Sequence, residues 1–137
     1  MNDIVAGKVR NLRDCLLRLR QVDPGDLAGI VADPLRQDSL VLNVQRACQT
    51  AIDLATHLVQ TARLGPPNDS RDAFRRLEAA GRLSPELSGN LQAMVGFRKI
   101  AVHRYHELDL RVLRAILDQR LGDLSAFADL AEAQSAS

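Results

Sequence analysis

Apolar residues recur at alternating spacings of three and four along almost the whole chain. The first series is Val5, Val9, Leu12, Leu16 and Leu19, and the second is Val41, Val44, Cys48, Ile52, Ala55 and Val59. This spacing places each series on one side of an α-helix. Alternating runs of β-branched residues and Asn-Gly or Asp-Gly hairpin turns, which indicate strands, do not occur in the sequence. The pattern therefore predicts an all-α fold.

Turn-forming residues predict where the first two long helices end. The first helix is expected from about Asp3 to Gln21, because the segment 23–25 (Asp-Pro-Gly) is a turn signal. A connector to about Pro34 leads to the second helix. That helix is expected to stop near Arg63, because the prolines in the segment 65–68 cannot continue it.

Capping residues predict the next two helix starts. Ser70 is the predicted N-cap of a short helix over 71–80. Ser84 is the predicted N-cap of a longer helix, in which Pro85 takes the first position and Glu86 complements the helix dipole. One stripe of this longer helix carries Leu87, Leu91, Met94 and Arg98.

The last helix is expected over 109–130, with its leucines facing inward. These are Leu110, Leu113, Leu117 and Leu124. Four main helices and a short one predict an antiparallel bundle, in one domain over 1–130. The small and polar residues 131–137 predict a flexible tail. The broad apolar stripes of the first two helices are also suited to dimerisation.

Composition narrows the class of protein. The chain has 137 residues, is 46% hydrophobic and 26% charged, and has no apolar run near the roughly 18 residues that cross a bilayer. Its N-terminus lacks a signal-peptide pattern, so we expect a cytoplasmic protein without a membrane segment. The net charge of +1 requires any nucleic-acid contact to depend on a local basic patch. Cys15 and Cys48 are predicted to be buried, reduced thiols.

The scarce polar residue types gather near the end of the Ser84 helix. The chain has three histidines, one tyrosine and no tryptophan, and His103, Tyr105 and His106 lie within four positions. Arg98, at a stripe position suited to an apolar residue, is expected in a polar pocket or a subunit interface. His103 follows five residues later, about 140° around a continuous helix. Either the helix breaks between them, or a second copy of the chain supplies the partner; Tyr105 returns to the Arg98 face if the helix continues.

Arginine and histidine together support phosphoryl transfer within RNA. Histidine takes a proton from a ribose 2′-hydroxyl, and arginine stabilises the charge that develops on the phosphate. The sequence has neither a His-Glu-x-x-His nor a Cys-x-x-Cys motif, so we predict no metal and no cofactor. The structural alternative is a salt-bridge cluster at a helix end, where cations suit the dipole.

The pattern Arg98-x(4)-His103-x-Tyr105 resembles the motif of HepT-like toxins, which belong to the HEPN superfamily. The flanking segments 94–109 and 51–58 are similar to that family as well. The resemblance implies a helical bundle that dimerises and acts as a metal-independent endoribonuclease toxin of a type VII toxin–antitoxin pair. Arg98 and His103 are then the catalytic pair, in a cleft between two protomers.

The resemblance also implies a partner and a substrate. The partner is an MNT-type nucleotidyltransferase antitoxin that adds AMP to Tyr105, and the substrate is RNA, with transfer RNA suggested for some members. Lys99 and Arg104 are the predicted RNA-contacting residues. Lys99 replaces the usual asparagine, and lysine can only donate hydrogen bonds. Two interpretations stay open: an active nuclease with added phosphate affinity, or a non-catalytic dimerisation module that binds the nucleotidyltransferase.

Other polar residues are expected to be structural. His57 is predicted at a structural or cleft-edge position, with a direct catalytic role as the alternative. Asp53, one turn earlier, is predicted at a helix-surface contact, with a role in orienting a cleft group as the alternative. His106 is expected to be exposed to solvent. The arginines of the short helix predict a solvated charged face; they are Arg71, Arg75 and Arg76.

Overall fold

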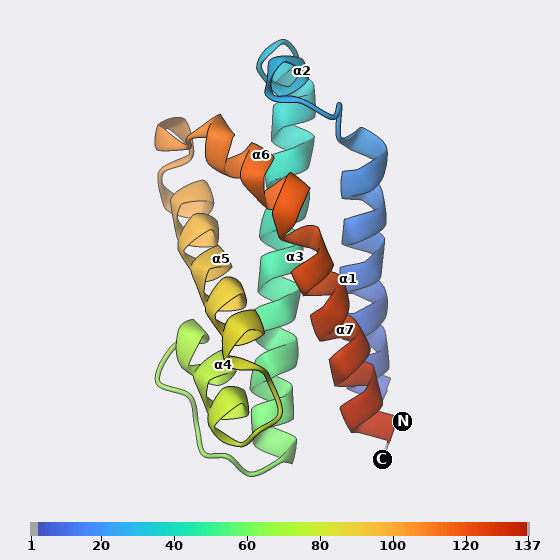
Figure 1. Cartoon of the computed structure of the whole chain (residues 1–137), viewed down its shortest axis with the longest axis vertical. Helices are drawn as coiled ribbons and strands as arrows, with labels where there is room; N and C mark the ends of the chain where they lie inside the picture. The colour runs from blue at the N-terminus through green and yellow to red at the C-terminus, as the bar shows by residue number, and fades with distance from the viewer. Residues whose placement is uncertain (1–2, 137) are drawn as a thin grey trace.

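The long helix α3 runs through the middle of the molecule, and the other long helices pack around it (Figure 1). The computed structural model describes residues 3–136, and every regular element within them is helical. The elements are α1 (Asp3–Val22), α2 (Leu27–Val31), α3 (Pro34–Thr61), α4 (Ser70–Ala79), α5 (Pro85–His103), the 3-10 turn η1 (Tyr105–Glu107), α6 (Leu110–Gln119) and α7 (Leu121–Ala136). The predicted all-α fold is confirmed.

The four main helices form the expected antiparallel bundle. In Figure 1, α1 and α5 run upward, whereas α3 and α7 run downward. The short helix α2 closes the upper end of α3, where α6 also crosses, and α4 packs against the lower parts of α3 and α5. The C-terminal end of α5 therefore lies beside the N-terminal part of α3.

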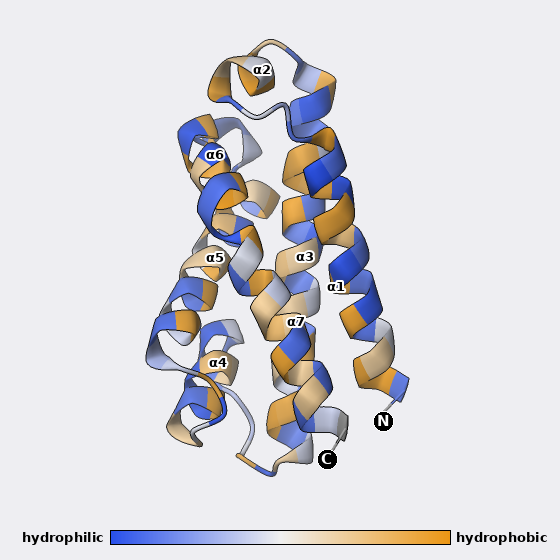
Figure 2. Cartoon of the chain, turned by 45° about the vertical axis from the view of Figure 1, so that its right-hand side comes forward, coloured by the Kyte–Doolittle hydropathy of each residue, from blue (hydrophilic) through white to orange (hydrophobic). Residues whose placement is uncertain are grey.

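The core is built from the apolar series that the sequence displays. Every member of the α1 series, from Val5 to Leu19, is at most 2% exposed, and much of the outward side of α1 is hydrophilic in Figure 2. Cys15 and Cys48 are both free and buried, as predicted. Phe74 of α4 and Phe127 of α7 meet edge to face, with ring centroids 5.6 Å apart.

Of the two predicted N-caps, one is confirmed and the other is wrong. Ser84 caps α5 as predicted, because its hydroxyl accepts a hydrogen bond from the backbone N–H of Leu87 at 3.1 Å. The prediction for Ser70 is wrong. Asp69 caps α4 instead, since its carboxylate accepts a hydrogen bond from the backbone N–H of Asp72 at 2.8 Å, and a carboxylate is at least as good a cap as a hydroxyl.

The single helix expected over 109–130 is divided at Arg120. α6 turns across the bundle to contact α2, whereas α7 packs along α1. The expected flexible tail is also corrected, because α7 continues to Ala136. Ala131 is fully buried, and the side-chain amide of Gln134 donates to the carbonyl oxygen of Arg82 at 2.9 Å. Ser137 lies outside the described residues.

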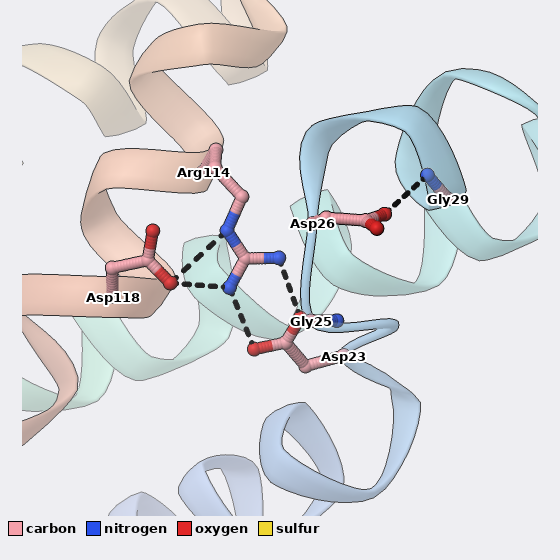
Figure 3. A network of polar contacts seen from close by, with 6 residues as sticks. All are labelled: Asp23, Gly25, Asp26, Gly29, Arg114 and Asp118. Atoms are coloured by element: carbon pink, nitrogen blue, oxygen red, sulfur yellow. Dashed lines mark hydrogen bonds and ion pairs between the residues drawn. The ribbon is translucent and has the colours of Figure 1, made fainter.

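A buried arginine attaches α6 to the end of α1 (Figure 3). Arg114 donates to both carboxylate oxygens of Asp23, at 2.6 and 2.8 Å, and to Asp118 at 2.7 Å. The nearby Asp26 caps α2 through the backbone N–H of Gly29 at 2.7 Å. The contact between Arg114 and Asp23 joins residues that are 91 positions apart in the sequence. By holding α6, it orients the segment that precedes this helix.

Candidate active site

The C-terminal end of α5 carries Arg98, Lys99 and His103. α5 is continuous from Pro85 to His103, so a break between the arginine and the histidine is excluded. The backbone N–H of Arg104 still donates to the carbonyl oxygen of Ile100 at 2.8 Å, and the helix ends there. Tyr105 therefore does not continue the Arg98 face, because it lies in η1 beyond the helix end.

Arg98 is a half-buried cation without an anionic partner. It follows the buried Leu91 and Met94 on the stripe that faces the core, as the sequence predicted. Its charge lies close enough to Cys48 of α3 to oppose the effect of burial, which raises the pKa of that thiol to about 12. Within residues 3–136, Arg98 makes no hydrogen bond or ion pair. A guanidinium in this state is suited to bind an incoming anion such as a phosphate.

His103 is exposed. Arg98 and His103 lie about 140° apart around the continuous helix and about 7.5 Å apart along its axis. Being in the last turn of α5, His103 is placed where the helix dipole favours a positive charge. The two residues therefore lie on different sides of α5 within one protomer.

Tyr105 is held by a residue that the sequence analysis missed. Its hydroxyl donates a hydrogen bond to the carboxylate of Asp38, in the second turn of α3, at 2.5 Å. Burial and this neighbouring carboxylate raise the pKa of Tyr105 to about 12, yet the side chain is still 43% exposed. No local pattern identifies Asp38, since only the antiparallel packing of α3 and α5 brings it to Tyr105.

The remaining basic residues of the segment are exposed. Lys99 has no ion pair within residues 3–136, whereas Arg104 lies 3.7 Å from the carboxylate of Glu107. The side chain of His106 is 83% exposed, which confirms the prediction for it. The outer side of α5 and η1 therefore presents positive charge close to His103.

Arg71 extends this basic surface from α4. It is half-buried, and its Nε is buried without a hydrogen-bond partner among the described residues. Its Nη2 lies 3.0 Å from the position that a Cβ would take on Gly96, so the glycine lets the guanidinium lie close to α5. Gly96 precedes His103 by seven residues and so shares its face of α5. The predicted solvated face is therefore wrong for Arg71. It is also wrong for Arg76, which is half-buried and donates to the carbonyl oxygen of Leu64 at 2.9 Å, whereas Arg75 is exposed as expected.

Asp53 and His57 lie apart from this segment. Asp53 is 3.7 Å from Lys8 of α1 and accepts a hydrogen bond from Gln49 at 2.7 Å, which supports the predicted surface contact. His57 lies about 13 Å further along α3 than Cys48. A groove of about 340 Å³ between α5, η1 and α6 has a mainly apolar lining, and its walls include neither Arg98 nor His103.

Residues 3–136 contain no group of three or more His, Cys, Asp or Glu residues arranged to hold a metal ion. No helix among them has the length and apolar character needed to span a bilayer.

The fold and the site define a small helical domain of the HEPN class, with an arginine and a histidine at the end of one helix beside a tyrosine. The family described as "Ribonuclease HepT-like" matches residues 12–131. The chain therefore belongs to the family of HepT-like ribonucleases.

Comparisons with individual proteins agree with this assignment. The chain is 40% identical over 134 residues to an mRNA nuclease HepT of Shewanella oneidensis, covering 98% of this chain and 100% of the relative. It resembles the tri-AMPylated Shewanella oneidensis HEPN toxin solved in complex with MNT antitoxin, with a TM-score of 0.90, 40% identity and coverage of 97% and 99% of the two chains. A toxin–antitoxin structure with AMP-PNP matches with a TM-score of 0.89 and 38% identity, covering 96% of this chain and 99% of that one.

Proposed function

We propose that this protein is a metal-independent endoribonuclease toxin whose catalytic residues are Arg98 and His103. The observation that carries the proposal is a half-buried, unpaired guanidinium on the same helix end as an exposed histidine. His103 takes the proton of a ribose 2′-hydroxyl, and the freed oxygen attacks the adjacent phosphorus. Arg98 stabilises the charge on the phosphate oxygens while the bond to the 5′-oxygen breaks.

The proposed active cleft lies between two copies of the chain. Because α5 is continuous, one protomer presents Arg98 and His103 on different sides. A two-fold dimer brings the arginine of one protomer to the histidine of its partner. Leu42 of α3 and Val102 of α5 support such an interface, since these apolar side chains are 43% and 48% exposed. Lys99 and Arg104 then contact the RNA backbone.

The proposed regulator is an MNT-type nucleotidyltransferase that attaches AMP to Tyr105. One similar structure contains a tri-AMPylated toxin with its MNT antitoxin, and Tyr105 is accessible two residues after His103. An AMP group there places bulk and negative charge where the RNA phosphate would bind. The name of the relative favours messenger RNA over the transfer RNA implied by the family motif. We place the protein in the cytoplasm, with its RNA.

Lys99 supports a second candidate function, a non-catalytic module that dimerises and binds the nucleotidyltransferase. Cleavage of defined messenger and transfer RNAs in the presence of a metal chelator separates the two functions. We expect cleavage by the wild-type protein and a loss of roughly 10²- to 10⁴-fold in the Arg98→Ala and His103→Ala variants. Tyr105→Phe is the matched control, which should cleave RNA but gain no AMP mass on co-expression with the nucleotidyltransferase. A wild-type protein that binds the partner and cleaves no RNA would establish the second function.

A further inference from the structure

Asp38 has no structural task that accounts for its contact with Tyr105. The start of α3 is capped by Asp33, whose carboxylate accepts a hydrogen bond from the backbone N–H of Arg36 at 3.2 Å. Asp38 lies beyond that first turn and is exposed. Among residues 3–136, no cation pairs with it, and its one side-chain hydrogen bond comes from Tyr105. The carboxylate is therefore available for chemistry at the tyrosine oxygen.

We propose that Asp38 orients the hydroxyl of Tyr105 and accepts its proton during nucleotidyl transfer. This inference rests on the proposed modification of Tyr105 and identifies a catalytic residue on the acceptor chain itself. As the tyrosine oxygen attacks the α-phosphorus of ATP, a new O–P bond forms and the bond from that phosphorus to the pyrophosphate oxygen breaks. Pyrophosphate leaves with the bond electrons, and the phenolic proton passes to the Asp38 carboxylate.

The state of the tyrosine requires a proton acceptor. A phenol whose pKa is raised to about 12 is almost wholly protonated at neutral pH, so the attacking oxygen has to lose its proton as the new bond forms. The carboxylate oxygen at 2.5 Å is already in contact with that proton. The tyrosine is 43% exposed, so its hydroxyl is also accessible to a nucleotide from solvent.

Other titratable groups of the segment do not take this position. His103, His106 and Glu107 lie within two residues of Tyr105 in the sequence, and all three are exposed. Within the described residues, none of them forms a hydrogen bond with the tyrosine hydroxyl. His106 lies instead 3.9 Å from Glu107. Asp38 is therefore the protein group placed to receive the proton.

The contact itself can be tested on the isolated protein. Tyr105 is the only tyrosine and the chain has no tryptophan, so intrinsic fluorescence reports on this phenol alone. A carboxylate hydrogen-bonded to a phenol quenches its emission. We expect Asp38→Asn to raise the emission clearly, and Asp53→Asn, an equivalent change elsewhere on α3, to leave it unchanged. Equal emission from all three proteins would contradict the hydrogen bond between Tyr105 and Asp38.

The catalytic role is tested by the rate of AMP addition with purified MNT-type nucleotidyltransferase and ATP, followed by intact mass. The side-chain oxygen of the Asp38→Asn variant can accept a hydrogen bond from the hydroxyl but cannot take its proton. We expect its kcat to fall about 10²-fold or more with little change in KM, and Asp53→Asn to match the wild type. If AMP is added to the Asp38→Asn variant at the wild-type rate, this inference alone is overturned. An unmodified wild-type Tyr105 contradicts the proposed regulation as well.

Discussion

Arg98 occupies a position where the packing of α5 favours an apolar side chain. A half-buried charge is unfavourable unless an anion accompanies it, and within residues 3–136 the fold provides none. The stripe of Leu87, Leu91 and Met94 was sufficient to predict this position, because helical spacing is a local property. Asp38 and Arg71 were not predictable in the same way. Their importance depends on which helices pack beside α5, and that information is spread over the whole chain.

Lys99 is expected to contribute to RNA affinity through one phosphate contact. In an inactive His103→Ala background, Lys99→Ala should reduce the slope of log K against log salt concentration by about one. Fluorescence anisotropy with a labelled RNA at several salt concentrations measures this slope. Arg10→Ala, which removes an exposed charge from α1, is the control and should leave the slope nearly unchanged. Equal slopes for the Lys99 and Arg10 variants would exclude a phosphate contact by Lys99.

The orientation of α6 depends on a few polar contacts as well as on its apolar face. The side chain of Arg114 is 11% exposed and is shared between Asp23 and Asp118, whereas Arg111, one turn earlier, is 79% exposed and paired with Asp109. Burial makes the first arginine important for stability and the second nearly dispensable. Because α6 follows η1, the same contact helps to hold the segment that contains Tyr105.

Arg114→Ala is expected to lower the free energy of unfolding by about 3 kcal/mol, since removing one partner leaves a partly buried charge uncompensated. Arg111→Ala removes an exposed ion pair and should cost less than about 1 kcal/mol. Chemical denaturation followed by circular dichroism compares the two variants with the wild type. Similar losses from both would show that Arg114 is no more important than a surface arginine.

The same contact predicts how stability depends on pH. Hydrogen bonds from Arg114, and a further one from the backbone N–H of Gly25, hold the pKa of Asp23 below its usual range. Its stabilisation is therefore present above the unfolded pKa of about 3.9 and is lost as the pH falls toward the lower folded value. Denaturation from pH 6 to pH 2 should show a shallower decline in Arg114→Ala than in the wild type. Parallel declines would contradict this assignment.

Helix boundaries were predictable where the signal is local. The start of α5 follows from Ser84 and Pro85, whose effects act within one turn. The division between α6 and α7 was missed because it depends on α6 turning toward α2. The helical state of residues 131–136 was missed for the same reason, since burial of Ala131 against the bundle outweighs the weak amphipathic pattern there.

The whole molecule has the predicted antiparallel bundle topology, and each connection between two main helices carries a short helix, α2, α4 or α6. A continuous α5 separates Arg98 from His103, while Val102, next to His103, and Leu42 of α3 are exposed apolar side chains. These features together favour an active site that is completed by a second protomer.

Mixing two inactive variants should restore part of the RNA cleavage. If each active site takes Arg98 from one protomer and His103 from the other, a heterodimer of Arg98→Ala and His103→Ala contains one intact site and one doubly damaged site. Unfolding and refolding the variants together at equal concentrations should recover about a quarter of the wild-type rate, because half of the dimers are mixed. Each variant refolded alone is the control. If both residues of a site came from one protomer, the mixture would stay as inactive as its components.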